Sequence, residues 1–511
     1  MRGNLQAAFA DYEKAIEFSR RWRLDVLPAD EFRISVETTL QKTYAAYIET
    51  GMELSLRNGD RQLAARMWEA MEENRSSSLR DGGKNAPNFP PVYWETMSAL
   101  RSALPGEVAG DAKSTSQAAA LRLKLAEIEA LSGVATINSL QIKERTLSEN
   151  SLIHLQQTLT GAEALISFHI GQDVSYAWAI TQLGVEVRRL SSRKSIELLA
   201  KDFRQAVERG GSSELAGSKL FAVLFGSFSR AIHKTPEWLL SVDEPLFGIP
   251  FSALVEKTDS GAGQYLVERR SVRLLPGALF SASTVLPSSQ HFTGIGDAIY
   301  NNADPRGSRS SERPAQQFPR LPGSGREIRV AARSWSQDRE PTLLEGAKVT
   351  RNAVRSALEA SPGIAHFALH VVQNPTASDQ VLLALGLRGS EPEYLSPSEI
   401  AAERVSASVV VLSGCGSGTG KALPGAGLLG LTRAWLAAGA RSVTATYWPI
   451  PDDAESFFQQ YYSALNRTAS GQLGARASAE ALRVAQLHMI RNGGAHAVPR
   501  YWSAFFTVGK D

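Results

Sequence analysis

The chain has 511 residues, of which 55 are Lys or Arg and 52 are Asp or Glu, so its formal net charge is +3. A charge this close to zero gives no electrostatic reason to expect nucleic acid or an anionic membrane surface as a partner. Hydrophobic residues make up 43% and charged residues 21% of the chain, which excludes disorder throughout and favours roughly two to four domains with sizeable cores.

Residues 1–80 have the periodicity of helices. Apolar side chains recur every three or four positions within 5–19, 40–58 and 62–79, and Asn58-Gly59 is typical of a helix C-terminus. Helices of this size favour a tetratricopeptide-like array, truncated at its start because the first helix resembles the second half of a repeat. An ordinary helical bundle fits the same pattern.

Residues 81–150 are predicted to be a linker and a helical connector. Gly, Pro and Asn are concentrated in 80–91, and a polar helix is expected over 114–131. A second irregular segment, 301–326, is rich in Pro, Gly and Ser and is predicted to be an exposed loop. Its arginines are Arg306, Arg309, Arg313, Arg320 and Arg326.

From about residue 162 the apolar pattern becomes that of strands. Residues 164–170 and 174–180 predict a β-hairpin around a Gly-Gln-Asp turn, and 185–190 predict a third strand. Strands and helices then alternate, which predicts an α/β sheet domain over 151–511.

Two apolar runs in this domain end in side chains that can take part in catalysis. Residues 406–412 predict a strand buried on both faces, followed by Ser-Gly and Cys415. Residues 363–370 predict another, in which His366 and His370 share a face. If the two strands are parallel neighbours, the imidazole of His370 and the thiol of Cys415 meet at the carboxyl edge of the sheet, where such folds bind ligands.

That pair is what nucleophilic cysteine catalysis requires. A free thiol is only slightly ionised at neutral pH, and a nearby imidazole raises its thiolate fraction and later protonates the leaving amine. The glycines beside Cys415 would let a substrate carbonyl approach backbone N–H groups that act as an oxyanion hole. A small buried thiol and a hydrogen-bonded structural histidine fit the same positions.

The sequence argues against two other kinds of site. Residues 418–421 resemble a phosphate-binding P-loop, but the first Gly and the final Ser or Thr of that motif are replaced by Cys415 and Ala422. His366 and His370 have the spacing of a zinc protease helix, but the Glu is missing and the segment is predicted to be a strand. Cys415 is the only cysteine, so a disulfide within the chain and a cysteine-rich metal site are excluded.

The location is predicted from what the chain lacks. No stretch approaches the ~18 continuous apolar residues of a membrane span. The first residues contain no apolar signal core. We therefore expect a soluble cytoplasmic protein with no metal or cofactor.

Several segments match a known family in order along the chain. They are Leu246–Leu254, Leu321–Glu327, His366–His370, Val409–Cys415, Gly427–Val443, Tyr447–Asp453 and Tyr501–Phe505. Residues from about 150 to 511 thereby resemble the CHAT domain, a caspase-like and separase-like cysteine peptidase domain often found behind tetratricopeptide repeats. The resemblance implies an α/β caspase-like, mostly parallel sheet with flanking helices, in which 151–290 form the N-terminal half and 291–511 the catalytic half.

The resemblance also implies roles for single residues. His370 would be the general acid/base and Cys415 the nucleophile, with the backbone N–H groups of Cys415 and Val371 as the oxyanion hole. Asp452 and Asp453 follow the last core strand, where related peptidases bind a basic P1 side chain. One of these aspartates also fits the N-cap of a helix over 454–465.

Val371 departs from the family pattern, which usually has Gly after the catalytic His. A β-branched residue does not readily adopt a positive φ, and its methyl groups crowd a cleft. Losing one oxyanion donor costs about a hundredfold to a thousandfold in rate.

The function that we expect is a regulated cysteine endopeptidase. Its helical repeats would bind a protein partner, and its α/β domain would cleave a protein substrate, with cleavage of its own segment 301–326 as a subsidiary possibility. The alternative is a catalytically inactive CHAT scaffold or protein-interaction module. Nucleotide hydrolysis at 416–421 is disfavoured by the failed P-loop spacing.

Overall fold

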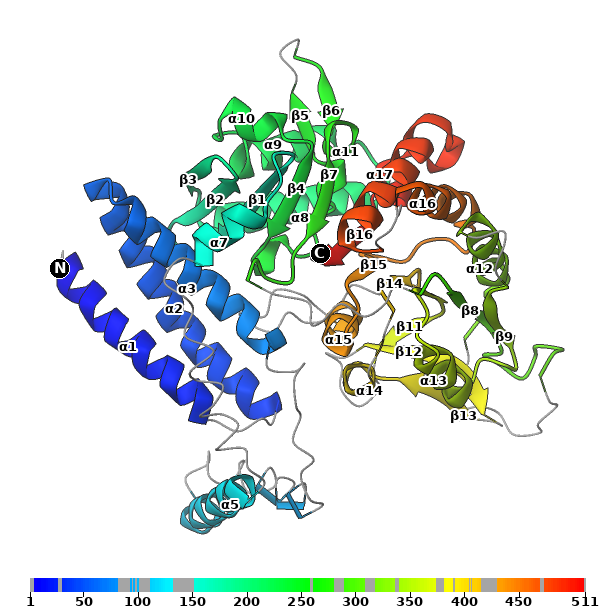
Figure 1. Ribbon diagram of the computed structural model, residues 1–511, viewed down its shortest axis with the longest axis horizontal. Coiled ribbons are helices and arrows are strands. Elements are labelled where there is room, and N and C mark those ends of the chain that lie inside the picture. The colour runs from blue at the N-terminus through cyan, green and yellow to red at the C-terminus, as the bar shows by residue number, and fades with distance from the viewer. Residues whose placement is uncertain are drawn as a thin grey trace. The chain divides into compact units, whose positions relative to one another are not determined.

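The chain forms two compact units, residues 1–60 with 84–151 and residues 61–83 with 152–511. Figure 1 shows a computed structural model of it. The structure describes residues 4–25, 30–80, 92–93, 95–96, 99–100, 111–131, 151–257, 261–279, 289–307, 318–335, 340–373, 381–388, 391–403, 405, 407–414, 430–468 and 473–509. Cys415 and the linker segment 81–91 therefore lie outside the described residues.

The first unit is helical. It contains α1 (Leu5–Asp25), α2 (Asp30–Asn58) and α5 (Ala112–Leu131). α1 packs on α2, and the rings of Phe9 and Tyr47 stack with their centroids 5.0 Å apart. Gly59 follows α2 with φ of 67°, which confirms the predicted helix end because this left-handed conformation favours glycine.

The second unit is built on one large sheet. Its strand order is β3-β2-β1-β4-β7-β16-β15-β14-β10-β8-β9, and most neighbouring strands are parallel. The strands are β1 (Glu163–His169), β2 (Ser175–Thr181), β3 (Gly184–Leu190), β4 (Glu237–Ser241), β7 (Ser271–Leu274), β8 (Phe292–Ala298), β9 (Thr342–Gly346), β10 (Ile364–Ala368), β14 (Val409–Leu412), β15 (Ser442–Thr446) and β16 (Phe505–Gly509). The predicted hairpin is confirmed as the antiparallel pair β1 and β2, and β3 pairs antiparallel with β2.

β16 joins two halves of this sheet. It pairs antiparallel with β15, in register from Ser442↔Gly509 to Thr446↔Phe505. On its other edge it pairs parallel with β7 through Val508↔Leu274. Strands from residues 163–274 therefore lie on one side of β16, and strands from residues 292–446 lie on the other.

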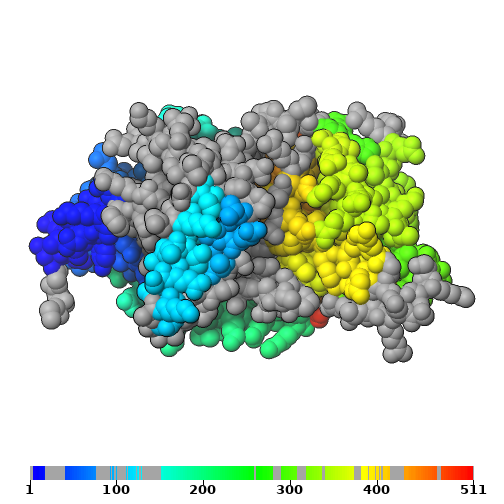
Figure 2. Space-filling model, turned by 90° about the horizontal axis from the view of Figure 1, so that it is seen from below, coloured from blue at the N-terminus to red at the C-terminus, as the bar shows by residue number. Residues whose placement is uncertain are grey.

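Two smaller sheets complete the strands. β11 (Val371–Gln373), β12 (Val381–Arg388) and β13 (Glu391–Leu395) form an antiparallel sheet, and β5 (Val255–Lys257) pairs with β6 (Gly263–Tyr265). The three-stranded sheet and α13 (Arg351–Glu359) lie together on the face drawn in Figure 2, coloured yellow-green to yellow.

Helices cover both faces of the large sheet. The remaining helices are α3 (Arg61–Arg80), α7 (Ser151–Thr158), α8 (Arg193–Glu208), α9 (Glu214–Leu224), α10 (Arg230–Lys234), α11 (Leu266–Arg269), α12 (Pro322–Trp335), α13 (Arg351–Glu359), α14 (Pro397–Ala402), α15 (Gly430–Ala438), α16 (Glu455–Thr468), α17 (Ala475–Asn492) and α18 (Pro499–Trp502), with 3₁₀ turns at Glu244–Leu246, Phe251–Ala253 and Gly494–Ala497.

Side chains of β10 show which helices lie on which face. Phe367 contacts Trp435 of α15, with ring centroids 4.9 Å apart, whereas the adjacent His366 contacts Phe458 and Tyr462 of α16. Successive residues of a strand point to opposite faces, so α15 and α16 cover opposite sides. The result is an α/β/α arrangement, and the predicted fold class of a mostly parallel sheet with flanking helices behind a helical region is confirmed.

α3 packs on the sheet rather than belonging to the first unit. The indole N–H of Trp68 donates to Ser167 Oγ of β1 at 3.0 Å, and that of Trp178 in β2 donates to the carbonyl of Ala64 at 3.1 Å. This grouping differs from the predicted repeat unit over 1–80. Periodicity identifies the apolar face of a helix but not the surface that it covers.

A buried charged cluster fixes the other end of α3. The guanidinium of Arg75 donates to Glu72 at 2.7 Å, to Ser241 Oγ at 2.7 Å, to the carbonyl of Phe168 at 2.6 Å and to Asp243 at 2.9 Å. The side chains of Arg75 and Glu72 are 3% and 0% exposed. Because each charge has a partner, this cluster can remain buried beneath the carboxyl ends of β1 and β4.

No helix among the described residues is both long and apolar enough to cross a membrane.

Candidate active site

β10 and β14 bring two segments of the predicted site to one edge of the sheet. They pair in parallel, from Ile364↔Val409 to Phe367↔Leu412. The two strands are therefore parallel neighbours, the condition on which the sequence-based argument for the site depends. His370 is the second residue after β10, and residue 415 is the third after β14 but lies outside the described residues. The meeting of imidazole and thiol stays a prediction.

The backbone before Cys415 approaches the backbone before His370 closely. A Cβ at Gly414 would lie 2.1 Å from the carbonyl oxygen of Leu369 and 2.9 Å from Cγ2 of Val371. The Gly414 carbonyl accepts a hydrogen bond from Thr446 Oγ1 at 2.7 Å. Only glycine fits this contact, which fixes the start of the segment that carries the cysteine.

The His370 ring is held by a carbonyl and two aromatic rings. Its Nε2 lies 2.8 Å from the carbonyl oxygen of Pro319. Its centroid is 4.8 Å from the ring of Tyr300 and 5.4 Å from that of Phe318. A carbonyl only accepts, so Nε2 carries the proton in the neutral ring and Nδ1 is left unprotonated.

Burial also sets the charge state of this histidine. Desolvation lowers the pKa of His370 below its ordinary 6.5, and the Pro319 carbonyl and the charge of Asp452 oppose that shift without cancelling it. The imidazole is therefore neutral at pH 7, as a general base must be.

Val371 begins β11 and is paired with Leu383 of β12. Among described residues other than glycine, positive φ occurs only at Asp297 and Ser361, so Val371 does not use the left-handed conformation that Gly would allow. Its side chain is partly buried against the core. Its part in an oxyanion hole stays a prediction.

Asp452 and Asp453 have different partners. Asp452 Oδ2 accepts the N–H of Gly323 at 2.7 Å, and a Cβ on Gly323 would lie 1.9 Å from the Asp452 carbonyl oxygen. Asp453 is 53% exposed and lies 3.3 Å from Nε2 of His496. The carboxylate of Asp452 thus caps α12, a helix far away in sequence. That one of the two aspartates caps the following helix stays a prediction.

Burial also affects the pKa of Asp452. Desolvation raises its pKa, Glu327 adds to this, and hydrogen bonds from the backbone of Gly323 and Ser324 act in the opposite direction. Asp452 is electrostatically coupled to His370 and to Tyr300, which places it in the surroundings of the predicted base.

Asp297, a residue that the sequence analysis missed, lies at the end of β8 beside this site. Its φ is 44°, a conformation that Asp tolerates better than most residues. Arg320 donates to both its carboxylate oxygens at 2.8 Å, and Arg306 donates to them at 2.7 and 3.1 Å. Arg306 also pairs with Asp304 at 2.6 Å. The arginine-rich segment was visible in the sequence, but its acidic partners were not.

The histidine within β10, His366, belongs to the core. His366 is fully buried, with Nε2 2.8 Å from Glu327 of α12 and Nδ1 3.0 Å from the hydroxyl of Tyr462. Burial raises the pKa of Tyr462 well above 10, so its hydroxyl stays protonated. Within the described part of the chain, no cluster of three or more His, Cys, Asp or Glu is placed to hold a metal ion.

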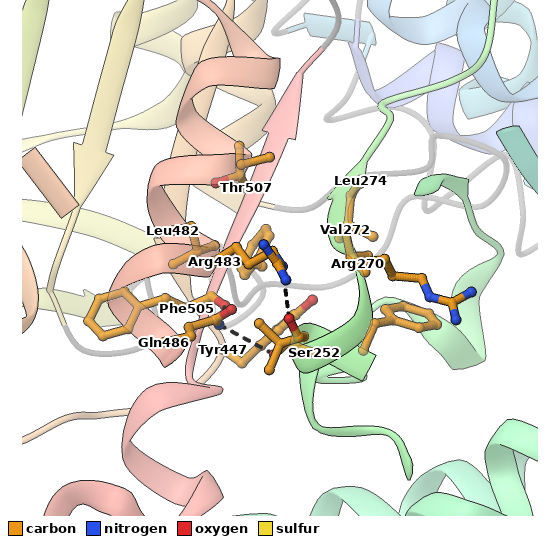
Figure 3. Close-up of a pocket in the computed structure, with 14 residues that line it drawn as sticks. Ser252, Arg270, Val272, Leu274, Tyr447, Leu482, Arg483, Gln486, Phe505 and Thr507 are labelled. Atoms are coloured by element: carbon orange, nitrogen blue, oxygen red, sulfur yellow. Dashed lines mark hydrogen bonds between the residues drawn. The ribbon is translucent and has the colours of Figure 1, made fainter. Parts of the chain in front are cut away.

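A pocket elsewhere in the second unit is a gap between packed core elements. It lies between β7, β16 and α17, as Figure 3 shows, and Leu274, Leu482 and Phe505 are among its apolar lining residues. Two of its polar side chains are bonded within the chain: Arg483 Nε donates to the Val267 carbonyl at 2.9 Å, and the Gln486 amide donates to Ser252 Oγ at 3.3 Å. None of the described site residues lines it.

Two curated relatives match short parts of the chain. Tetratricopeptide repeat protein 28 of Mus musculus is 35% identical over 120 residues, which are 23% of this chain and 4% of that protein. The protein of the same name from Homo sapiens is 36% identical over 86 residues, 17% of this chain and 3% of that protein. The chain thus matches only a small fraction of the length of these relatives.

Solved structures show more distant likeness. The separase–securin complex of Saccharomyces cerevisiae at 2.6 Å has a TM-score of 0.38 at 10% identity, covering 93% of this chain and 45% of that chain. The complex of the pro- and mature domains of Porphyromonas gingivalis RgpB has a TM-score of 0.32 at 8% identity, covering 62% and 76%. At these scores the fold assignment depends on the strand order itself.

The family match is the most extensive of these comparisons. Residues 214–510 match the CHAT domain, from α9 through β16. This range includes β8, β10, β14 and β15, the strands whose ends form the candidate site, and it confirms the resemblance seen in the sequence. Since it covers more than half of the residues, the chain belongs to the CHAT domain family.

Proposed function

We propose that the protein is a cysteine endopeptidase that uses His370 as general acid/base and Cys415 as nucleophile. The observation that carries the proposal is the parallel pairing of β10 with β14, because both residues follow the carboxyl ends of these adjacent strands. The contact between Gly414 and Leu369 supports it by drawing the two segments together.

The surroundings of His370 suit a base. Its Nε2–H is oriented by the Pro319 carbonyl, which leaves Nδ1 unprotonated and able to accept a proton. In the proposed reaction Nδ1 takes the proton of Cys415, and the thiolate attacks the substrate carbonyl. The imidazolium then protonates the amine as the C–N bond breaks. Water, deprotonated by the same imidazole, hydrolyses the thioester and returns the free thiol.

The other site residues enter as parts of this proposal. The N–H groups of Cys415 and Val371 would donate to the oxyanion, which needs only backbone groups. Asp452 and Asp453 would attract a basic substrate side chain, although Asp452 already accepts a hydrogen bond from α12. The helical region would bind a protein partner that regulates cleavage.

The test is the rate at which a peptide electrophile with Arg at P1 labels Cys415. We expect rapid labelling in the wild type and a loss of at least about a hundredfold in His370→Ala, because the base contributes that much. His154→Ala is the matched control, since His154 is exposed on α7, away from the ends of β10 and β14. Its rate should equal that of the wild type.

Slow labelling that is equal in wild type and His370→Ala would contradict the proposal. The inactive scaffold would then be the better account of the fold. Fast, His370-dependent labelling by a peptide with an apolar P1 only would retain the peptidase and remove the basic pocket at Asp452 and Asp453.

A further inference from the structure

The Pro319 carbonyl orients the proposed base, and its own position depends on neighbouring groups. Phe318 is tied to the segment after β8, because Asn301 Nδ2 donates to the Phe318 carbonyl at 2.8 Å. On the other side, Arg320 is bound to Asp297 through two hydrogen bonds of 2.8 Å. The carbonyl that contacts His370 therefore lies between two anchors.

The Arg320 anchor is the stronger one. A planar guanidinium that donates two parallel hydrogen bonds to one carboxylate fixes both distance and angle, which a single contact does not. The Asp297 side chain is 8% exposed, and Arg320 is 41% exposed. Burial alone would raise the pKa of Asp297, but the hydrogen bonds and charges of Arg320 and Arg306 lower it, so the carboxylate stays ionised at neutral pH.

The backbone of Asp297 also helps to hold this residue in place. Its left-handed φ of 44° carries a cost that the surroundings must offset. Its N–H donates to Ser324 Oγ in the first turn of α12 at 2.7 Å. The residue therefore links the end of β8, the start of α12 and the segment that contains Pro319. Arg306, which also pairs with Asp304, donates to both oxygens of the same carboxylate.

We propose that Arg320 and Asp297 are positioning residues for catalysis: their bidentate ion pair holds the Pro319 carbonyl against Nε2–H of His370 and so leaves Nδ1 free to take the thiol proton. This inference rests on the proposed peptidase function. Neither residue touches the substrate in it. They act through Pro319 by selecting the tautomer and the angle of the imidazole.

The experiment compares Arg320→Met, Arg320→Lys and Asp297→Asn with the wild type. Arg326→Met is the matched control, because Arg326 is a similarly exposed arginine of the same stretch that pairs with Glu455 instead. Two quantities are measured in each protein. One is the His370-dependent labelling rate of Cys415, and the other is the ¹H–¹⁵N signal of the His370 Nε2–H, assigned with His370→Ala.

We expect Arg320→Met and Asp297→Asn to label about tenfold more slowly or worse, the loss typical of a removed supporting partner. In both variants the Nε2–H signal should broaden into solvent exchange, because the ring is no longer held on Pro319. Arg320→Lys should be intermediate, since an ammonium cannot make the bidentate contact. Arg326→Met should match the wild type in both quantities.

The two readouts separate the ways in which this inference can fail. If labelling slows while the Nε2–H signal is unchanged, the ion pair does not act through His370 and the positioning role is refuted. If neither quantity changes in Arg320→Met, it is refuted outright. If labelling never depends on His370 in any variant, the peptidase proposal fails and the catalytic role of the pair fails with it.

Discussion

Replacing Arg75 by methionine tests the packing of α3 on the sheet. Methionine keeps the length of the side chain but removes the donors to Glu72, Asp243, Ser241 and the Phe168 carbonyl. Glu72 would then be a fully buried carboxylate without its cation, although Ser241 Oγ still donates to it at 3.0 Å.

The size of the effect follows from that uncompensated charge. Breaking a buried ion pair by removing one partner costs about 3–5 kcal/mol. The lower part of this range is the better expectation, because Asp243 is 27% exposed and also accepts the N–H of Ile170 at 2.8 Å. Arg476→Met is the matched control. Arg476 pairs with Glu237 at the surface, where such a pair contributes about 0–1 kcal/mol.

A second substitution, Glu72→Gln, should change the stability in opposite directions in the wild type and in Arg75→Met. Glu72→Gln should destabilise the wild type, because it removes the anion that Arg75 needs. In the Arg75→Met background the same change should stabilise, because the buried charge disappears while an oxygen remains to accept from Ser241 and from the Ala278 N–H.

Urea denaturation followed by far-UV circular dichroism measures these differences. We expect Arg75→Met to lower the midpoint clearly and Arg476→Met to leave it nearly unchanged. A loss below about 1 kcal/mol in Arg75→Met would refute the argument. So would a Glu72→Gln effect of equal sign and size in both backgrounds, since the two charges would then be uncoupled.

Three further predictions concern the candidate site. An NMR titration of His370 should have its midpoint below pH 6.5. Because the pKa of His370 is lower in the folded than in the unfolded protein, its contribution to stability should fall as the pH drops below 6.5. A midpoint at or above 6.5 would count against the burial argument. Asp452→Ala should lower the free energy of unfolding by about 1 kcal/mol through lost capping at Gly323, and Asp452→Asn should lose much less; equal losses would mean that capping is not its contribution. Gly414→Ala should cost about 1–3 kcal/mol and slow labelling of the thiol, because its Cβ overlaps the Leu369 carbonyl; wild-type thermal stability would contradict the close approach.

Local periodicity predicted the elements but not their distant partners. The hairpin of β1 and β2 was visible as two apolar runs around a Gly-Gln-Asp turn, and the apolar runs of β10 and β14 mark strands buried on both faces. The three-stranded sheet at β11 was missed, since its outer strands are short or mixed in polarity: β11 has three residues, and β13 carries two glutamates and a proline. The docking of α3 was missed because Trp68 meets Ser167 across 99 positions of sequence.

The same limit applies to the site. His370 was identified because it ends a buried strand, and Asp452 because it follows another. The contacts that define their environment were not predictable: Pro319 is 51 positions from His370, and Gly323 is 129 positions from Asp452. Capping rules describe only a helix and its immediate neighbours, so they gave no sign that Asp452 accepts from the start of α12.

The position of β16 has a consequence for the order of folding. Within the large sheet, the five strands from residues 163–274 can pair among themselves, and so can the five from residues 292–446. The inner edges of these two groups, β7 and β15, stay open until residues 505–509 insert between them. The pairing of Leu274 with Val508 closes a loop of more than 200 residues, a late and slow event for a folding chain. Before it occurs, the molecule carries two unprotected strand edges, the sites at which unfinished sheets aggregate. Any factor that shields nascent chains of this protein should therefore act at β7 and β15.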